Sequence, residues 1–136
     1  MSIEISEQER EGIEILDLKG RLTFGEEDGA LREEVEKLLR EDKTKVVINL
    51  GELHQIDTAS FGTLRYAQDK LKAAGGGLAL AGLKPAHIEV LMKCRLGVEF
   101  RTFEDDLEAV NSFFPGREVH HFDVLEFVKS KVPPGE

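Results

Sequence analysis

Apolar and polar residues alternate near the start of the chain, in the pattern typical of β-strands. Every second residue is apolar over residues 3–6, and residues 13–18 form a second such strand that alternates until Leu16. Glu11 and Gly12 separate the two runs. We therefore predict an antiparallel hairpin whose turn lies at these two residues.

Two later segments have the 3.6-residue period of amphipathic helices. In residues 26–40 the apolar side chains fall on one stripe: Leu31, Val35, Leu38 and Leu39. A second helix, capped by Asp57 or Thr58 and stopped by residues 75–77, would turn the following residues inward: Phe61, Leu64, Ala67 and Leu71. Further helices are expected from Pro85 to Gly97, with Ile88, Leu91 and Met92 on the core side, and from Glu104 to Phe113.

Continuous apolar runs between the helices indicate buried strands. Residues 45–50 form a β-branched run typical of a central strand covered on both faces, and residues 51–56 are expected to follow it as a loop. Shorter strands are expected at residues 78–81 and 99–101. The order predicts an α/β fold: a mixed, mostly parallel sheet with an N-terminal antiparallel edge hairpin and about four covering helices.

The C-terminal segment reads as an addition to this domain. Pro115 and Gly116 mark a boundary between a domain over residues 1–114 and an extension over residues 115–136. The extension contains an amphipathic stretch with Phe122, Leu125 and Val128. Exposed side chains of this size are unfavourable in a small protein, so we expect the extension to pack on the domain or to form a homodimer contact.

Composition restricts the possible partners. The chain of 136 residues fits one domain and has a formal net charge of −9, and residues 1–42 hold 14 acidic and 6 basic side chains. Without a Lys/Arg cluster, nucleic-acid binding and anionic membrane surfaces are not expected. No stretch is long and apolar enough for membrane insertion, and residues 1–4 lack the pattern of a signal peptide, so we expect a cytoplasmic protein.

Three motifs that resemble enzyme or metal sites do not meet the chemical requirements. The glycines at 75–77 lack the Lys-Ser/Thr of a phosphate-binding loop, and they follow a helix instead of preceding one. His120 and His121 are adjacent and have no third ligand at metal spacing. Cys94 lies between two basic residues but has no base or orienting group in sight. The sequence therefore predicts no enzyme, no catalytic residue, no cofactor and no metal site.

The most informative segment is residues 56–62, where a buried strand leads to the start of a helix. Asp57, Thr58 and Ser60 place a carboxylate and two hydroxyls at a helix N-terminus, where unpaired N–H groups and the positive end of the dipole stabilise added phosphate. The same residues also make an ordinary N-cap without further function. The residues alone leave both interpretations open.

Taken together with its neighbours, this segment resembles the STAS domain, the fold of bacterial anti-sigma factor antagonists. The family pattern is a hydrophobic strand ending in Asn/Asp-Leu, a short loop, and then Asp, two hydroxyl residues, Gly, Leu and Gly. Here the strand ends at Asn49-Leu50 and the motif starts at Asp57. The glycines at 75–77 and the helix start after Leu83 also fit, and the resemblance covers residues 3–113.

The resemblance implies a phosphorylation switch in signal transduction and transcription regulation. Thr58 stands at the phosphate-acceptor position, with Ser60 as a second candidate. The implied partners are an anti-sigma factor that is itself a serine/threonine kinase, bound only by the unphosphorylated form, and a phosphatase that resets the switch. The implied interface comprises five residues: Asp57, Thr58, Ala59, Ser60 and Phe61.

The motif departs from the family pattern at three positions. Ala59 replaces the second hydroxyl, Ser60 the Gly and Phe61 the Leu. Related departures occur in STAS members that assemble signalling scaffolds. Other members are accessory subunits of lipid transporters. A constitutive scaffold or accessory subunit without phosphorylation therefore stays the alternative function.

Overall fold

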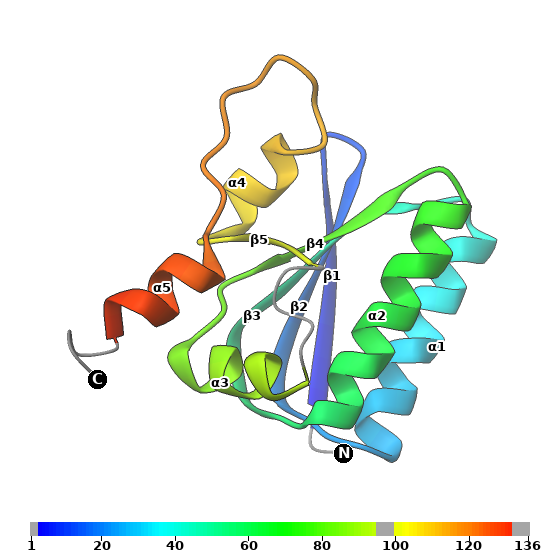
Figure 1. Ribbon diagram of the computed structural model, residues 1–136. Helices are drawn as coiled ribbons and strands as arrows, with labels where there is room; N and C mark the ends of the chain where they lie inside the picture. The colour runs from blue at the N-terminus through cyan, green and yellow to red at the C-terminus, as the bar shows by residue number, and fades with distance from the viewer. Residues whose placement is uncertain (1–2, 95–99, 132–136) are drawn as a thin grey trace.

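A computed structural model describes residues 3–94 and 100–131 of the chain (Figure 1). Within these ranges strands and helices alternate after an initial hairpin. The elements are β1 (Ile3–Arg10), β2 (Ile13–Leu22), α1 (Glu26–Arg40), β3 (Lys45–Ile56), α2 (Thr58–Ala73), β4 (Gly77–Ala81), α3 (Pro85–Lys93), β5 (Arg101–Phe103), α4 (Asp106–Asn111) and α5 (Val124–Lys131).

The strands form one sheet in the order β1-β2-β3-β4-β5. β1 pairs with β2 in antiparallel fashion, and the other neighbours are parallel. Glu11 and Gly12 have φ angles of 55° and 83°, the left-handed values that a tight two-residue hairpin turn needs. The predicted α/β class, the antiparallel edge hairpin and the mostly parallel sheet are confirmed.

Helices cover the two faces of the sheet unequally. The larger core lies under α1, α2 and α3, and it includes the predicted inward residues of α2, each at most 1% exposed: Phe61, Leu64, Ala67 and Leu71. α1 and α2 run side by side over this face (Figure 1). On the opposite face, Ala109 and Val110 of α4 pack with Ile15, Val47 and Phe103 in a smaller core. Part of that second face therefore carries no helix among the described residues.

The segment expected as a loop at residues 51–56 is the second half of β3. Its pairing with β2 is irregular: one residue is added to β3 between Asn49 and Glu52, and another between Leu53 and Gln55. Each β-bulge shifts the alternation of faces by one residue. Leu50, Leu53 and Ile56 consequently all reach the larger core at a spacing of three, which hides the two-residue period of a strand.

Other boundaries differ by a few residues from those predicted. β5 begins at Arg101, two residues after the predicted start at Glu99, which lies outside the described residues. α4 begins at Asp106 because Asp105 caps it: its carboxylate accepts a hydrogen bond from the Glu108 N–H at 2.9 Å. α3 ends at Lys93, and the predicted stop at Gly97 also lies outside the described residues.

The chain after α4 returns to the domain. The Phe122 N–H donates to the Thr102 carbonyl at 2.8 Å, and the Thr102 hydroxyl donates to the Phe122 carbonyl at 2.6 Å. In α5, Val124 is 3% exposed and Phe127 and Val128 pack on the larger core. The side chain of Leu125 lies outside the described residues. The division into residues 1–114 and 115–136 stays a prediction.

Candidate functional site

Asp57 connects the end of β3 to the start of α2. One carboxylate oxygen accepts a hydrogen bond from the Ser60 N–H at 2.9 Å, the usual N-cap bond. The other accepts from the Phe24 N–H, also at 2.9 Å. Burial alone would raise the pKa of Asp57, but hydrogen bonding from Phe24 and Ser60 outweighs it and lowers the pKa. Asp57 is therefore an anion at neutral pH, and it holds two segments together.

Thr58 is the first residue of α2, and its side chain is exposed. Ala59 beside it is exposed as well. The first N–H groups of a helix have no partner within the helix, and they form the positive end of its dipole. Thr58 thus combines an accessible hydroxyl with an environment that accepts negative charge.

Ser60 and Phe61, both in the predicted interface, are fully buried at 0% exposure. The Phe61 ring lies in the larger core with its centroid 6.3 Å from that of Phe100. The Ser60 hydroxyl has no hydrogen-bond partner among the described residues, but it is shielded from any partner protein. The helical period turns both side chains inward, while Thr58 and Ala59 are exposed at the helix start. The interface of Asp57, Thr58, Ala59, Ser60 and Phe61 stays a prediction.

Phe24 is a surface residue that the sequence pattern did not single out. Its side chain is 75% exposed, although its N–H is bonded to Asp57 directly before Thr58. An aromatic ring this exposed is unfavourable in water and is typical of protein interfaces. Its proximity to Thr58 depends on the β2–α1 loop, which a sequence read one element at a time does not place.

A second carboxylate fixes the same loop from the other side. Asp28 accepts hydrogen bonds from the Gly25 N–H at 2.7 Å and from the Thr63 hydroxyl of α2 at 3.0 Å. Asp28 is 6% exposed, so these bonds are shielded from water. The loop carrying Phe24 is thus tied to the start of α2 by Asp57 and to its second turn by Asp28. The Phe24–Thr58 surface is preorganised.

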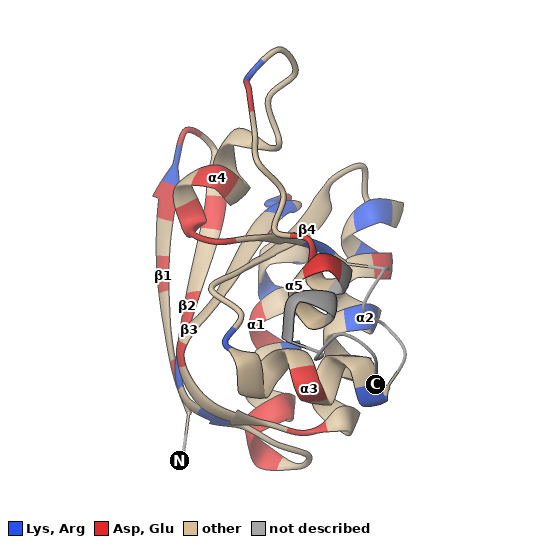
Figure 2. Cartoon of the chain, turned by 60° about the vertical axis from the view of Figure 1, so that its left-hand side comes forward, with Lys and Arg blue, Asp and Glu red and all other residues tan. Residues whose placement is uncertain are grey.

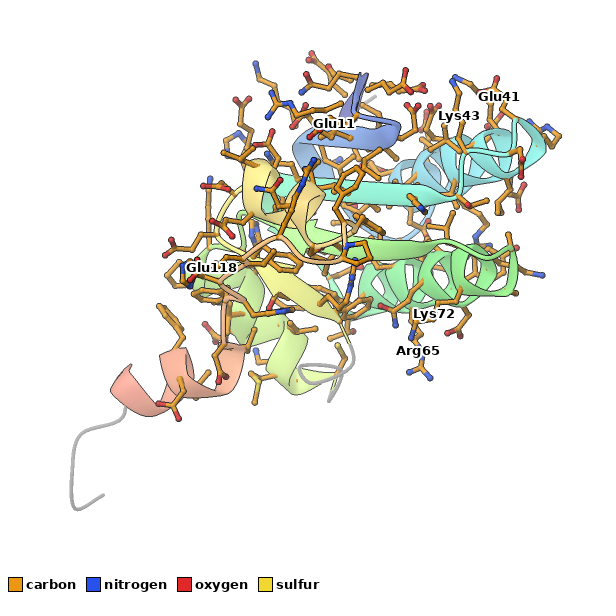
Figure 3. The ribbon with its side chains drawn as sticks, turned by 90° about the horizontal axis from the view of Figure 1, so that it is seen from above. Glu11, Glu41, Lys43, Arg65, Lys72 and Glu118 are labelled. Atoms are coloured by element: carbon orange, nitrogen blue, oxygen red, sulfur yellow. The ribbon has the colours of Figure 1, made fainter. Side chains whose placement is uncertain are left out.

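The distribution of charge fits a protein partner better than a polyanion. Figure 2 shows acidic residues along β1 and α4, with Lys and Arg scattered between acidic positions. Figure 3 shows long charged side chains projecting outward, such as Glu41 and Lys43 at one end and Glu118 at another. With 27 acidic and 18 basic side chains, the chain lacks the excess of positive charge that binding to phosphate backbones needs.

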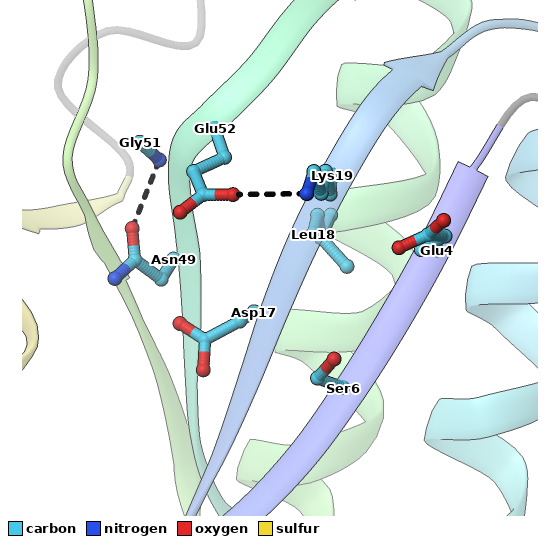
Figure 4. Close-up of a pocket in the computed structure, with 8 residues that line it drawn as sticks. All are labelled: Glu4, Ser6, Asp17, Leu18, Lys19, Asn49, Gly51 and Glu52. Atoms are coloured by element: carbon cyan, nitrogen blue, oxygen red, sulfur yellow. Dashed lines mark hydrogen bonds and ion pairs between the residues drawn. The ribbon is translucent and has the colours of Figure 1, made fainter.

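A polar groove of about 620 Å³ lies on the part of the sheet that α4 leaves open (Figure 4). Side chains from three strands line it, including Ser6, Asp17 and Asn49. The Asn49 amide oxygen accepts from the Gly51 N–H at 2.9 Å, and Lys19 lies 4.0 Å from Glu52. That ion pair is 63% and 74% exposed, so the groove is open to water.

The other residues weighed in the sequence analysis are Cys94, His120 and His121. Cys94 is half-buried at the end of α3, and its thiol donates to the Leu91 carbonyl at 3.2 Å. The His121 ring lies 4.8 Å from that of Phe103, and His120 is exposed. Within residues 3–94 and 100–131, no three His, Cys, Asp or Glu side chains gather as metal ligands. None of the helices in these ranges has the length and apolar character to cross a membrane.

His87 of α3 is a buried residue that the sequence analysis did not weigh. It is 1% exposed; its Nδ1 accepts from the Lys84 N–H at 3.0 Å, so Nε2 carries the proton and donates to the Leu53 carbonyl at 2.7 Å. Burial lowers the pKa of His87, and the bond to Leu53 only partly offsets this. His87 is a neutral bridge between α3 and β3.

The family model of the STAS domain matches residues 4–109 of the chain. Among curated proteins no sequence matches the chain. Among solved structures, a putative anti-sigma factor antagonist from Thermotoga maritima is similar, with 18% identity, a TM-score of 0.71, and coverage of 80% of this chain and 93% of that one. An anti-sigma factor antagonist from Mycobacterium paratuberculosis has 16% identity, a TM-score of 0.71, and coverage of 82% and 94%.

The phosphorylated form of SpoIIAA, a Bacillus cell fate determinant, shares the fold as well. Its identity is 17% and its TM-score 0.60, with 81% of this chain and 97% of that chain covered. At identities this low, the structural similarity establishes a common fold and nothing more specific. The family match spans most of the chain, from the first strand to α4, and includes the Asp57–Thr58 junction.

Proposed function

The chain belongs to the STAS domain family, and from this we propose that it is a phosphorylation-controlled protein-binding module of the anti-sigma factor antagonist type. Its partner would be an anti-sigma factor with serine/threonine kinase activity, bound by the unphosphorylated form. A phosphatase would return the phosphorylated form to the binding state. We propose a binding module and not an enzyme, because the polar groove is open to water and the Lys19–Glu52 ion pair in it is largely exposed.

The observation that carries this proposal is the position of Thr58. It is exposed at the first position of α2, directly after the capping Asp57, while Ser60 two residues later is fully buried. Of the two candidate acceptors, only Thr58 offers its hydroxyl to a kinase in the described conformation. The structures of similar fold include SpoIIAA in unphosphorylated and phosphorylated forms, which supports the proposal of control by phosphorylation.

The switch would be electrostatic. A phosphate on Thr58 adds a charge of about −1.5 to −2. The ionised Asp57 stands next to it in the sequence, although its two oxygens already accept N–H groups. The N-terminus of α2 tolerates this added charge, so the fold persists. In a contact with a partner, by contrast, a buried unpaired charge costs on the order of 2–5 kcal/mol, enough to reverse binding.

Phe24 would supply the apolar part of the contact. An exposed aromatic ring held by a fixed backbone loses little conformational freedom on binding. Thr58 and Ala59 would then form the part that senses phosphate. This arrangement separates affinity, which comes from Phe24, from control, which comes from Thr58.

The test compares Thr58→Ala and Thr58→Glu as baits in lysate of the source cell, with captured kinases identified by mass spectrometry. Thr58→Ala is expected to retain the kinase permanently and Thr58→Glu to lose most of it. Ala73→Glu, which adds the same charge at the exposed far end of α2, is the matched control and is expected to bind like wild type. Equal recovery by both Thr58 variants contradicts the switch and favours a constitutive scaffold or transporter subunit.

A further inference from the structure

A second pocket lies at the other end of α2 from Thr58. It has a volume of about 270 Å³, below the range of roughly 300–1,000 Å³ typical for drug-sized ligands. Gln68 and Lys72 of α2, Arg101 of β5, and Ser112 and Phe113 after α4 contribute to its lining. The pocket therefore sits where α2, α4 and the sheet edge meet.

Arg101 is the unusual residue of this pocket. Its Nη2 is shielded from solvent and has no hydrogen-bond partner among the described residues. The group stacks on Phe113, with Cζ 4.6 Å from the ring centroid. Stacking stabilises the face of the guanidinium, but it leaves the N–H donors at its edge without acceptors.

An unpaired guanidinium in a shielded position is costly. Burial lowers the pKa of Arg101, and no anion among the described residues counteracts it. Proteins normally pair such a group with a carboxylate or phosphate, whose planar or forked oxygens match two N–H donors. Among the described residues no such acceptor is bonded to Nη2 of Arg101, and a bound anion would supply the missing negative charge.

The rest of the lining favours the same ligand. Lys72 adds a second positive charge from the last turn of α2, and Figure 3 shows its side chain extending from that helix. Among the described residues that line the pocket, none is Asp or Glu. In a chain of net charge −9, a pocket whose described lining holds two cations and no carboxylate departs from the overall charge pattern.

We propose that this pocket binds a small oxyanion, a phosphate or carboxylate group, between Arg101 and Lys72. Arg101 and Lys72 both line the pocket and supply the positive charge that holds the anion. The size of the pocket restricts the ligand to a free anion or to the anionic end of a small metabolite. The site is separate from Thr58, because the 16 residues of α2 put about 24 Å between its ends.

The first experiment titrates the full chain with inorganic phosphate at constant ionic strength and records the side-chain NMR signal of the Arg101 Nε–H. A saturable shift of this signal and of the Gly77 and Phe113 amides is expected. Citrate in a parallel titration distinguishes a carboxylate ligand from phosphate. Sodium chloride at matched ionic strength shows whether any anion produces the effect.

The variants identify the residues. Arg101→Met is expected to abolish the saturable shifts, and its melting temperature without phosphate is expected to equal or exceed that of wild type, because an unpaired charge is removed. Lys72→Ala is expected to weaken binding roughly tenfold, the loss of about one charged contact. Lys70→Ala removes the same charge from the same helix, over Tyr66 and outside the pocket, and is expected to bind like wild type.

Phosphate also stabilises folded proteins without binding to them, so the decisive quantity is the difference between variants. Linear, non-saturable shifts, or equal shifts in wild type and Arg101→Met, overturn the proposal. The outcome is independent of Thr58, since Thr58→Ala leaves the pocket intact. Loss of kinase binding with retained phosphate binding, or the reverse, separates the failure of one proposal from that of the other.

Discussion

The carboxylate of Asp57 accepts the N–H of Phe24 at 2.9 Å although 33 residues separate them in the chain. The same carboxylate caps α2 through Ser60. One side chain therefore sets both the start of the helix and the position of the loop beside it. Asp57 is first a structural residue, and any role beside Thr58 builds on that geometry.

Asp57→Ala is expected to destabilise the protein by about 1–3 kcal/mol. The loss of an N-cap costs about 0.5–2 kcal/mol, and the Phe24 N–H loses its acceptor in addition. Urea unfolding measures the change. Asp105→Ala is the matched control, because Asp105 caps α4 with the same 2.9 Å bond and no second loop bond is seen. Equal losses for both variants would show that the Phe24 bond contributes nothing.

Phe24→Ala is expected to weaken partner binding by at least tenfold while changing the unfolding free energy by less than about 0.5 kcal/mol. The ring is 75% exposed, so its removal leaves no cavity, whereas aromatic anchors dominate interface energy. Leu107→Ala, at 50% exposure on α4, serves as a control and should bind normally. Binding of the identified kinase by calorimetry distinguishes the two.

Stability is expected to fall as the pH drops below about 6.5, because of His87. Its pKa is lowered in the folded protein, so the unfolded chain binds the proton first and acidification favours unfolding. The slope for one such group is at most about 1.4 kcal/mol per pH unit, over the window between 6.5 and the lower folded pKa. Urea unfolding across this window, in wild type and His87→Gln, measures the effect.

Two glutamates act in the opposite direction at lower pH. Burial, together with hydrogen bonding to Glu7, raises the pKa of Glu14 and of Glu34 above 4.5 in the folded protein. Their protonation therefore favours the fold as the pH falls, and their contribution is lost as the pH rises through the raised pKa.

In the His87 experiment, the control variant is His54→Gln, since His54 is an exposed histidine. A slope unchanged in His87→Gln would assign the acid sensitivity to other groups.

Deletion of residues 117–136 is expected to lower the melting temperature or to change the oligomeric state. It removes Val124, which is 3% exposed, and uncovers the surface under Phe127 and Val128. Val124→Ala alone is expected to cost about 1–2 kcal/mol for two buried methyl groups. Removal of residues 132–136 is the control. Unchanged melting and unchanged mass for the long deletion would show that the extension is only a tail.

The sequence predicted the elements whose period is regular. Residues 26–40 form α1 with the predicted ends, since the apolar stripe and the acidic first turn agree. The prediction of a loop for the second half of β3 was wrong, because its two bulges place Leu50, Leu53 and Ile56 at a spacing of three. A bulge is a property of two paired strands, and one strand read alone does not show it.

For the candidate site, the sequence located the helix start but not its surroundings. The prediction of Asp57 or Thr58 as the cap is settled in favour of Asp57. The inward orientation of Ser60 is consistent with the helical period that places Phe61 in the core, although Ser60 is the second candidate acceptor in the sequence analysis. Phe24 and His87 were missed because their contacts span 33 and 34 residues.

The two edge strands of the sheet, β1 and β5, influence self-association at high protein concentration. β5 is three residues long, and the chain at Phe122 hydrogen-bonds alongside it. β1 is longer and largely exposed, and it carries Glu4, Glu7 and Glu9. Charged side chains on such an edge strand oppose strand-to-strand association between molecules. We expect this protection to weaken toward the isoelectric point near pH 5.0, so that self-association through β1 precedes unfolding on acidification.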